Sequence, residues 1–191
     1  MSQKKKRFLA LALTLSSFSV FADGTNAGTV HFTGEIIEPS CVIDGDSGTD
    51  NNVPLGTYPT TLFANPGDKS TAMPFTIRLK DCPIQTDGLN HVQLTFEGVT
   101  EPNSNAELLT VSALTTAGST AATNVGIAVS KVETPGTLLK LDGSEDQIAI
   151  PLSRNAGDAI FQDFLARYQA FAIPVTAGPA DADMTVNILY R

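Results

Sequence analysis

Few side chains in this sequence could carry chemistry, and they are scattered along the chain. There are two cysteines, Cys41 and Cys82, and two histidines, His31 and His91. Neither histidine stands in a pattern of serine, cysteine or carboxylate residues that would complete a catalytic triad or a metal site. The chain also has no GxSxG, HExxH, P-loop or dinucleotide-binding motif. These residues therefore predict a protein that is not an enzyme and that needs no cofactor or metal ion.

The acidic run Asp44–Asp50 has a composition that suggests calcium binding. An EF-hand loop requires glycine at its sixth position and glutamate at its twelfth. Counted from Asp44, these positions hold Thr49 and Leu55. The run is therefore better explained as a solvated turn.

Residues 1–22 have the pattern of a secretory signal peptide. Lys4–Arg7 form a basic start, Phe8–Phe21 an apolar run, and Val20 and Ala22 supply small residues ahead of the cleavage point. The apolar run is shorter than the roughly 20 residues that a membrane span needs. We therefore expect cleavage after Ala22, export of the mature chain, and no membrane span in it.

The mature chain is strongly acidic. Four of the 12 Lys and Arg residues lie in the signal peptide and all 20 Asp and Glu residues remain, so its net charge is −12. This charge argues against nucleic acid or an anionic membrane surface as a partner. Because an exported chain meets an oxidising environment, its even cysteine count predicts a Cys41–Cys82 disulfide. Closing a loop of about 40 residues stabilises a fold by roughly 4 kcal/mol on the chain-entropy model.

Alternating apolar and polar residues, which are typical of strands, recur along the mature chain. Glycine, proline and asparagine turns separate them, and a helix is conceivable only near Glu107 or Gly157–Asp163. This pattern predicts one all-β domain, a β-sandwich. Arg167 and Tyr168 are then better explained as core and rim residues than as catalytic ones. The expected strands lie within 29–37, 41–43, 53–55, 73–79, 91–98, 108–114, 124–132, 138–141, 147–152, 159–173 and 184–190.

The two ends of the mature chain have features of an assembly site. The last expected strand places four side chains on one face, Met184, Val186, Ile188 and Tyr190, and the chain then stops at Arg191. A long apolar edge strand invites pairing with another chain. The first residues, 23–32, begin small and flexible and then alternate, as a strand that fills another edge would. Together the ends predict strand donation between copies, which is a form of β-augmentation.

The sequence resembles a known family at several points along the mature chain. Gly178 is fourteenth from the C-terminus and Tyr190 is penultimate, as in that family. On these features the chain resembles the subunits of chaperone–usher fimbriae and is close to the major pilins of type 1 fimbriae. The segments that carry the resemblance are GTVHFTGEIIEPSC, RLKDC, NVGIAV and FLARYQAF.

The resemblance implies an incomplete immunoglobulin-like β-sandwich that lacks its last strand. Residues 23–34 would form the N-terminal extension and 35–191 the pilin domain. A periplasmic chaperone would lend a strand to the groove beside the C-terminal strand, and at the outer-membrane usher this strand would be exchanged for the extension of the next subunit. The implied donor residues are Asn26, Gly28, Val30, Phe32 and Gly34. The implied acceptor and chaperone-binding residues are Gly178, Met184, Val186, Ile188, Tyr190 and Arg191, the last through its terminal carboxylate.

The function implied is that of a structural subunit in a homopolymeric surface fimbria that supports cell adhesion on a Gram-negative cell. A minor or adaptor subunit, which starts, joins or ends the fibre, would share the same length, domain and extension. A tip adhesin with its own glycan pocket is a third interpretation. Such tips usually carry an additional N-terminal lectin domain, for which residues 23–191 leave no room.

Overall fold

The computed structural model of this chain describes residues 28–34, 36–38, 40–116 and 118–191. These residues fall into two units, 28–33 and 34–191. The expected signal peptide and the expected donor residue Asn26 lie outside the described residues.

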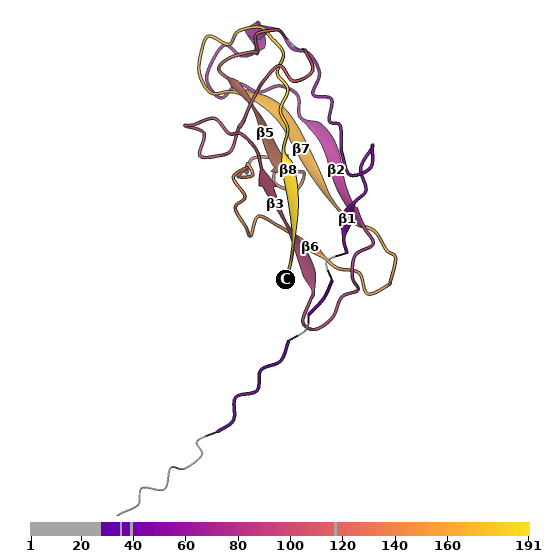
Figure 1. Cartoon of the computed structure of the whole chain (residues 1–191). Helices are drawn as coiled ribbons and strands as arrows, with labels where there is room; N and C mark the ends of the chain where they lie inside the picture. Colours follow the sequence, from indigo (N-terminus) through magenta and orange to yellow (C-terminus); the bar gives the residue numbers. More distant parts are fainter. Residues whose placement is uncertain (1–27, 35, 39, 117) are drawn as a thin grey trace, which may run out of the picture. The chain divides into compact units, whose positions relative to one another are not determined.

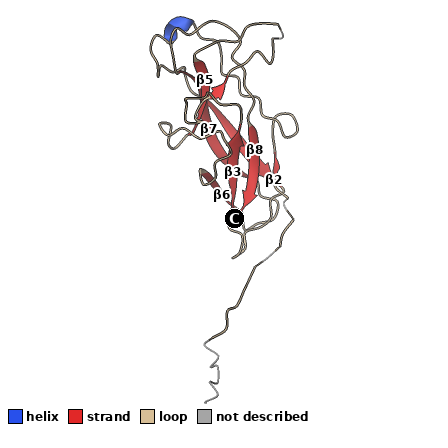
Figure 2. Cartoon of the chain, turned by 60° about the vertical axis from the view of Figure 1, so that its left-hand side comes forward, coloured by secondary structure: helices blue, strands red, loops and turns tan. Residues whose placement is uncertain are grey.

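The larger unit is an antiparallel sandwich of two sheets (Figure 1). The first sheet has the order β1-β2-β7-β5-β4 and the second the order β6-β3-β8. Figure 2 shows that strands and loops make up almost all of the described chain, and its one helical element is the short 3-10 turn η1, Thr60–Leu62. The strands are β1 (Val42–Ile43), β2 (Met73–Lys80), β3 (His91–Glu97), β4 (Leu109–Thr110), β5 (Val125–Lys131), β6 (Ile148–Pro151), β7 (Ile160–Ala170) and β8 (Thr185–Tyr190).

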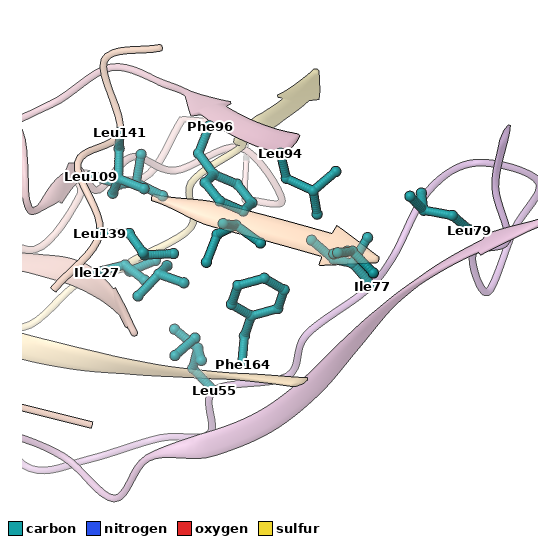
Figure 3. Close-up of a cluster of buried hydrophobic side chains, with 14 of the residues drawn as sticks. Leu55, Ile77, Leu79, Leu94, Phe96, Leu109, Ile127, Leu139, Leu141 and Phe164 are labelled. Atoms are coloured by element: carbon teal, nitrogen blue, oxygen red, sulfur yellow. The ribbon is translucent and has the colours of Figure 1, made fainter. Parts of the chain in front are cut away.

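The core lies between the sheets, and side chains of both sheets contribute to it (Figure 3). Phe164 of β7 stands at its centre, fully buried. Its ring meets Phe96 of β3 edge-on at 5.6 Å and stacks on Phe75 of β2 at 5.3 Å between centroids. Such aromatic contacts add to the stabilisation by burial itself. The predicted all-β sandwich is therefore confirmed.

The predicted disulfide is also confirmed. Cys41 and Cys82 are bonded across 41 positions of sequence. Cys41 directly precedes β1 and Cys82 follows β2 by two residues, so the bond closes the end of this strand pair, in which Val42 lies opposite Lys80. The bridge thus holds the short edge strand β1 to the longer strand beside it.

Several expected elements differ from the structure. The described parts of Thr29–Ile37 carry no strand, because an alternating segment becomes a strand only where a neighbour supplies backbone hydrogen bonds. Val53–Leu55 is a loop, and its Leu55 packs into the core. Leu138–Leu141 is not a strand and makes only isolated main-chain hydrogen bonds, such as the one from Leu139 N–H to the Val129 carbonyl at 2.8 Å. Neither region near Glu107 or Gly157 is helical.

Candidate functional site

The edge formed by β8 is the candidate functional site. Every residue of β8 lies opposite a residue of β3, from Thr185 opposite Glu97 to Tyr190 opposite Val92. On the other side of β8, no strand within the described parts of the chain pairs with it, so β8 ends the sheet (Figure 1). An antiparallel edge strand presents unpaired N–H and C=O groups along that side. The structure therefore offers a backbone template for one more strand.

The inward side chains of β8 are less buried than the residues they face. On β3 the exposed fraction is 0% for Val92, Leu94 and Phe96. Their opposite residues on β8 belong to the same core cluster but are only partly buried. Burial therefore falls off toward the open edge, as expected where a sandwich lacks its last strand. These β8 residues are Val186, Ile188 and Tyr190.

The C-terminal end of β8 is tied to the rest of the domain by three kinds of bond. The Cys41 N–H donates to the Tyr190 hydroxyl oxygen at 2.8 Å. The main chain of Arg191 accepts from His91 N–H at 3.2 Å and donates to the His91 carbonyl at 3.1 Å. The Arg191 guanidinium forms an ion pair with Glu145 at 2.6 Å, with both side chains about half exposed. The strand therefore ends in a defined position despite its open edge.

Three of the predicted acceptor residues lie outside β8: Arg191, which follows it, and Met184 and Gly178, which precede it. Met184 directly precedes the strand and is partly buried against the core. Gly178 stands in the preceding loop, where a Cβ atom would lie 2.6 Å from Ala122 N and closer still to the Thr120 carbonyl oxygen. A side chain at this position would collide with main-chain atoms. The structural reason for glycine here is thus close packing of two loops.

The loop ahead of β8 is anchored through Asp181, which the sequence analysis did not single out. Ser112 and Asp181 exchange main-chain hydrogen bonds of 2.7 and 2.9 Å. The Asp181 carboxylate also accepts from the Thr115 N–H at 3.0 Å and the Thr115 hydroxyl at 2.7 Å. These hydrogen bonds lower the pKa of Asp181. An aspartate after thirteen residues without charge (168–180) was the available signal in the sequence.

Among the predicted donor residues, the structure describes Gly28, Val30, Phe32 and Gly34. The exposed fraction is 75% for Val30 and 93% for Phe32. Burying a large apolar side chain of this kind typically gains about 1.5–3 kcal/mol. The described part of the extension therefore exposes apolar side chains whose burial would be favourable.

Other polar groups in the domain have structural explanations. Arg167 is 5% exposed and donates to the Ser130 hydroxyl at 3.3 Å and to the Pro135 carbonyl at 2.9 Å. Burial lowers the pKa of Arg167.

Within the described residues, no three His, Cys, Asp or Glu side chains are grouped as metal ligands would be. No helix in that part of the chain has the length and apolar character needed to cross a membrane.

This two-sheet sandwich with an unpaired last strand is an incomplete immunoglobulin-like fold. A family model described as "Fimbrial protein" matches residues 30–191, and the chain belongs to this family. The chain is 37% identical to the "Probable major fimbrial subunit LpfA" of Escherichia coli O157:H7, over 98% of this chain and 97% of that protein. It is 34% identical to the "Type-1 fimbrial protein, A chain" of Escherichia coli K12, over 94% and 93% of the two chains.

Solved structures show the same fold. The P pilus rod subunit PapA aligns with a TM-score of 0.58 at 20% identity, over 80% of this chain and 99% of that chain. A subunit from a chaperone–usher pilus structure that addresses rod uncoiling aligns with a TM-score of 0.56 at 20% identity, over 89% and 99%. The protein is therefore a structural subunit of a fimbria, as its sequence predicts, and neighbouring subunits are its partners in the polymer.

Proposed function

We propose that this chain is the repeating shaft subunit of a fimbria and that it polymerises by donor-strand exchange at the β8 edge. The observation that carries the proposal is the difference in burial across one strand pair. Ile188 is partly buried, whereas Leu94 directly opposite is 0% exposed. A strand added beside β8 would cover the inward side chains and pair with the open backbone edge.

Residues 23–34 of a second copy are the proposed added strand. Val30 and Phe32 share one parity with Gly28 and Gly34, so their side chains would enter the open side of the sandwich together. Gly28 brings no side chain, which suits a position where the acceptor core approaches the added backbone closely. No described residue of this segment lies in a strand of its own domain. Pairing in a neighbour would bury Phe32, which is 93% exposed, against the acceptor core.

The open β8 edge also explains why assembly would need a chaperone and an usher. A sandwich with an open side exposes core, so a lone subunit would be marginally stable and prone to aggregation. A periplasmic chaperone would cover β8 first, contacting Met184–Tyr190 and the terminal carboxylate of Arg191. The outer-membrane usher would then exchange the chaperone strand for residues 23–34 of the next subunit. Export would begin with cleavage of residues 1–22, and the mature protein would have no enzymatic role.

A truncation tests strand donation directly. Mature 23–191 and a variant that starts at Thr33 are each co-expressed with the cognate chaperone, released, and run unheated on a denaturing gel. We expect a ladder of polymers from the mature chain and none from the truncation. Ladders from both, or a stable folded monomer of 23–191 without chaperone, would overturn the proposal.

A point substitution provides a sharper comparison. Phe32→Asp places a charge in the proposed donor strand, whereas Phe161→Asp places one at an exposed phenylalanine on β7 that is 55% exposed. We expect Phe32→Asp to abolish the ladder and Phe161→Asp to keep it. The abundance of the chain in fibres sheared from cells separates a shaft subunit, which dominates them, from an adaptor, which is scarce.

A further inference from the structure

One end of the sandwich is built from loops that contain no charged residue. The loops are 56–67, 113–123 and 171–180, and we call their described residues the uncharged cap. None of the three holds Asp, Glu, Lys, Arg or His, although 17% of the whole chain is charged. Figure 2 shows η1, which belongs to the first loop, at one end of the sandwich and the C-terminus toward the other.

The three loops of the cap form one continuous surface. A hollow of about 370 Å³ is lined by residues of all three, including Tyr58, Thr116 and Val175, and at its edge by Asp181, whose carboxylate is bonded to Thr115. The second and third loops are also joined by hydrogen bonds, from Thr123 N–H to the Thr176 hydroxyl at 3.0 Å and from Ala122 N–H to the Pro179 carbonyl at 2.9 Å. The cap is therefore a joined structural unit.

Large apolar side chains are exposed on this cap. Leu114 is 56% exposed and Ile173 is 53% exposed, and Leu62 and Phe171 are 39% and 37% exposed. A surface that is depleted of charge and carries exposed aliphatic and aromatic groups has the composition of the core of a protein–protein interface. An uncharged, apolar surface does not help to keep a protein in solution. Solubility therefore does not explain this surface on a chain whose mature form carries a net charge of −12.

The direction of a strand added to β8 indicates which molecule docks on the cap, so this step depends on the proposed function. All the strand pairs of both sheets are antiparallel. A strand that continues this arrangement runs opposite to β8, and its C-terminal end lies beside Thr185, where β8 begins. The loop that leads into Thr185 comes directly from the cap. The donated strand therefore leaves the acceptor at the cap end.

The body of the donating copy must then lie close to the cap. Its β1 begins at Val42, eight positions after Gly34. Eight extended residues reach at most roughly 29 Å. The disulfide holds the segments around Cys41 and Cys82 together, and near it Ile36, Val42 and Ile84 have exposed fractions of 102%, 40% and 47%. This disulfide end of the donor is the apolar surface nearest to the acceptor.

We propose that the uncharged cap of each subunit is the docking surface for the disulfide end of the next copy, the one whose extension it holds. The contact is additional to strand donation and fixes the angle between successive domains. It would bury Leu114 and Ile173 of one copy against residues near the disulfide of the other.

Photo-crosslinking in assembled fibres tests this contact. A benzophenone amino acid replaces Ile173 in the cap, and in a control variant it replaces Phe161 on β7. We expect crosslinked dimers from position 173 whose second peptide falls within residues 34–42 or 81–88 of the other copy. Absence of dimers, or crosslinks from position 173 to any other region, would overturn the proposal. The same second peptide from position 161 would overturn it as well.

A charge variant separates this inference from strand donation itself. Ile173→Glu should bind a synthetic peptide of residues 23–34 as the parent chain does, because β8 is unchanged. Its fibres should dissociate in denaturant about tenfold faster, because the interface would desolvate a carboxylate. Equal dissociation rates would contradict the cap contact and would leave its hollow to another ligand, such as a glycan. Failure of the parent chain to bind the peptide would instead contradict the proposed function.

Discussion

The hydroxyl oxygen of Tyr190 accepts a hydrogen bond from the Cys41 N–H at 2.8 Å, between residues 149 positions apart in the sequence. Tyr190 ends β8 in the three-stranded sheet, and Cys41 precedes β1 at the edge of the five-stranded sheet. The bond therefore bridges the two sheets at one end of their open side. It also connects the open edge to the segment that carries the disulfide.

Tyr190→Phe should weaken this connection while keeping the ring. Loss of one intramolecular hydrogen bond typically costs about 1 kcal/mol, so we expect a decrease of that size in the free energy of unfolding. The measurement is denaturant unfolding of the chain completed with a peptide of residues 23–34. Tyr58→Phe is the matched control. It removes the hydroxyl of a tyrosine whose ring packs on Tyr168, and it leaves the bond between Cys41 and Tyr190 in place. An unchanged midpoint for Tyr190→Phe would show that the bond does not stabilise the closed end.

Tyr190→Ala should have a larger effect, because it removes the aromatic ring from the edge as well. Truncation of an aromatic anchor typically costs 2 kcal/mol or more at an interface. We therefore expect reduced recovery of the complex with the chaperone from periplasmic extracts, compared with Tyr190→Phe. Equal recovery of the two variants would argue against Tyr190 as an anchor for the chaperone.

Gly178→Ala should destabilise the loop that leads into β8. The added Cβ would meet main-chain atoms of Thr120 and Ala122, which cannot move aside as a flexible side chain can. Overpacking of this kind typically costs about 1–3 kcal/mol. Gly136→Ala is the control, because a Cβ at Gly136 has no atom within 4 Å. We expect a lower melting temperature for Gly178→Ala only, and equal melting temperatures would contradict the close-packing explanation.

The sequence was sufficient to predict the strands that have one face in the core. In β2 and β7 the apolar residues alternate because Ile77 and Phe164 face the other sheet while their neighbours do not. Short apolar runs were less informative, since three residues such as Val53–Leu55 can reach the core from a loop. The strand β8 was also predicted, because apolar residues alternate from Met184 to Tyr190.

Contacts that depend on the folded arrangement were not predictable. The Tyr190–Cys41 bond joins two distant segments, and no local pattern of residues marks it. The packing of Gly178 against Thr120 and Ala122 depends likewise on two loops that meet only in the folded domain. The uncharged cap was visible as three stretches without charge, but only the structure brings them together.

Gly28→Arg should block polymerisation and leave the pilin domain folded on its chaperone. The proposed donor strand needs a residue without a side chain where it approaches the acceptor core, and arginine would also bring a charge there. Gly136→Arg is the control, with the same substitution at an open position in the domain. Electron microscopy and unheated gels measure the product. Normal fibres from Gly28→Arg would exclude Gly28 from the donor contact.

Asp181 should make the loop ahead of β8 sensitive to acid. Hydrogen bonds from Thr115 hold the pKa of Asp181 below its ordinary value of 3.8 in the folded chain. A carboxyl group whose pKa is lower in the folded than in the unfolded state stabilises the fold above the unfolded pKa. This contribution is lost as the pH falls through the folded pKa. Stability should therefore decrease as the pH falls below about 4.

The measurement compares the parent chain with Asp181→Asn, each completed with a peptide of residues 23–34, by thermal unfolding between neutral pH and pH 2. Other carboxyl groups, among them Asp44 and Asp158, also have lowered pKa values and contribute to acid sensitivity in both proteins. Only the difference between the two curves therefore reports on Asp181. We expect the parent chain to be the more stable at neutral pH and the difference to shrink in acid. A difference that does not change with pH would mean that the pKa of Asp181 is the same in the folded and unfolded chain, which would contradict this prediction.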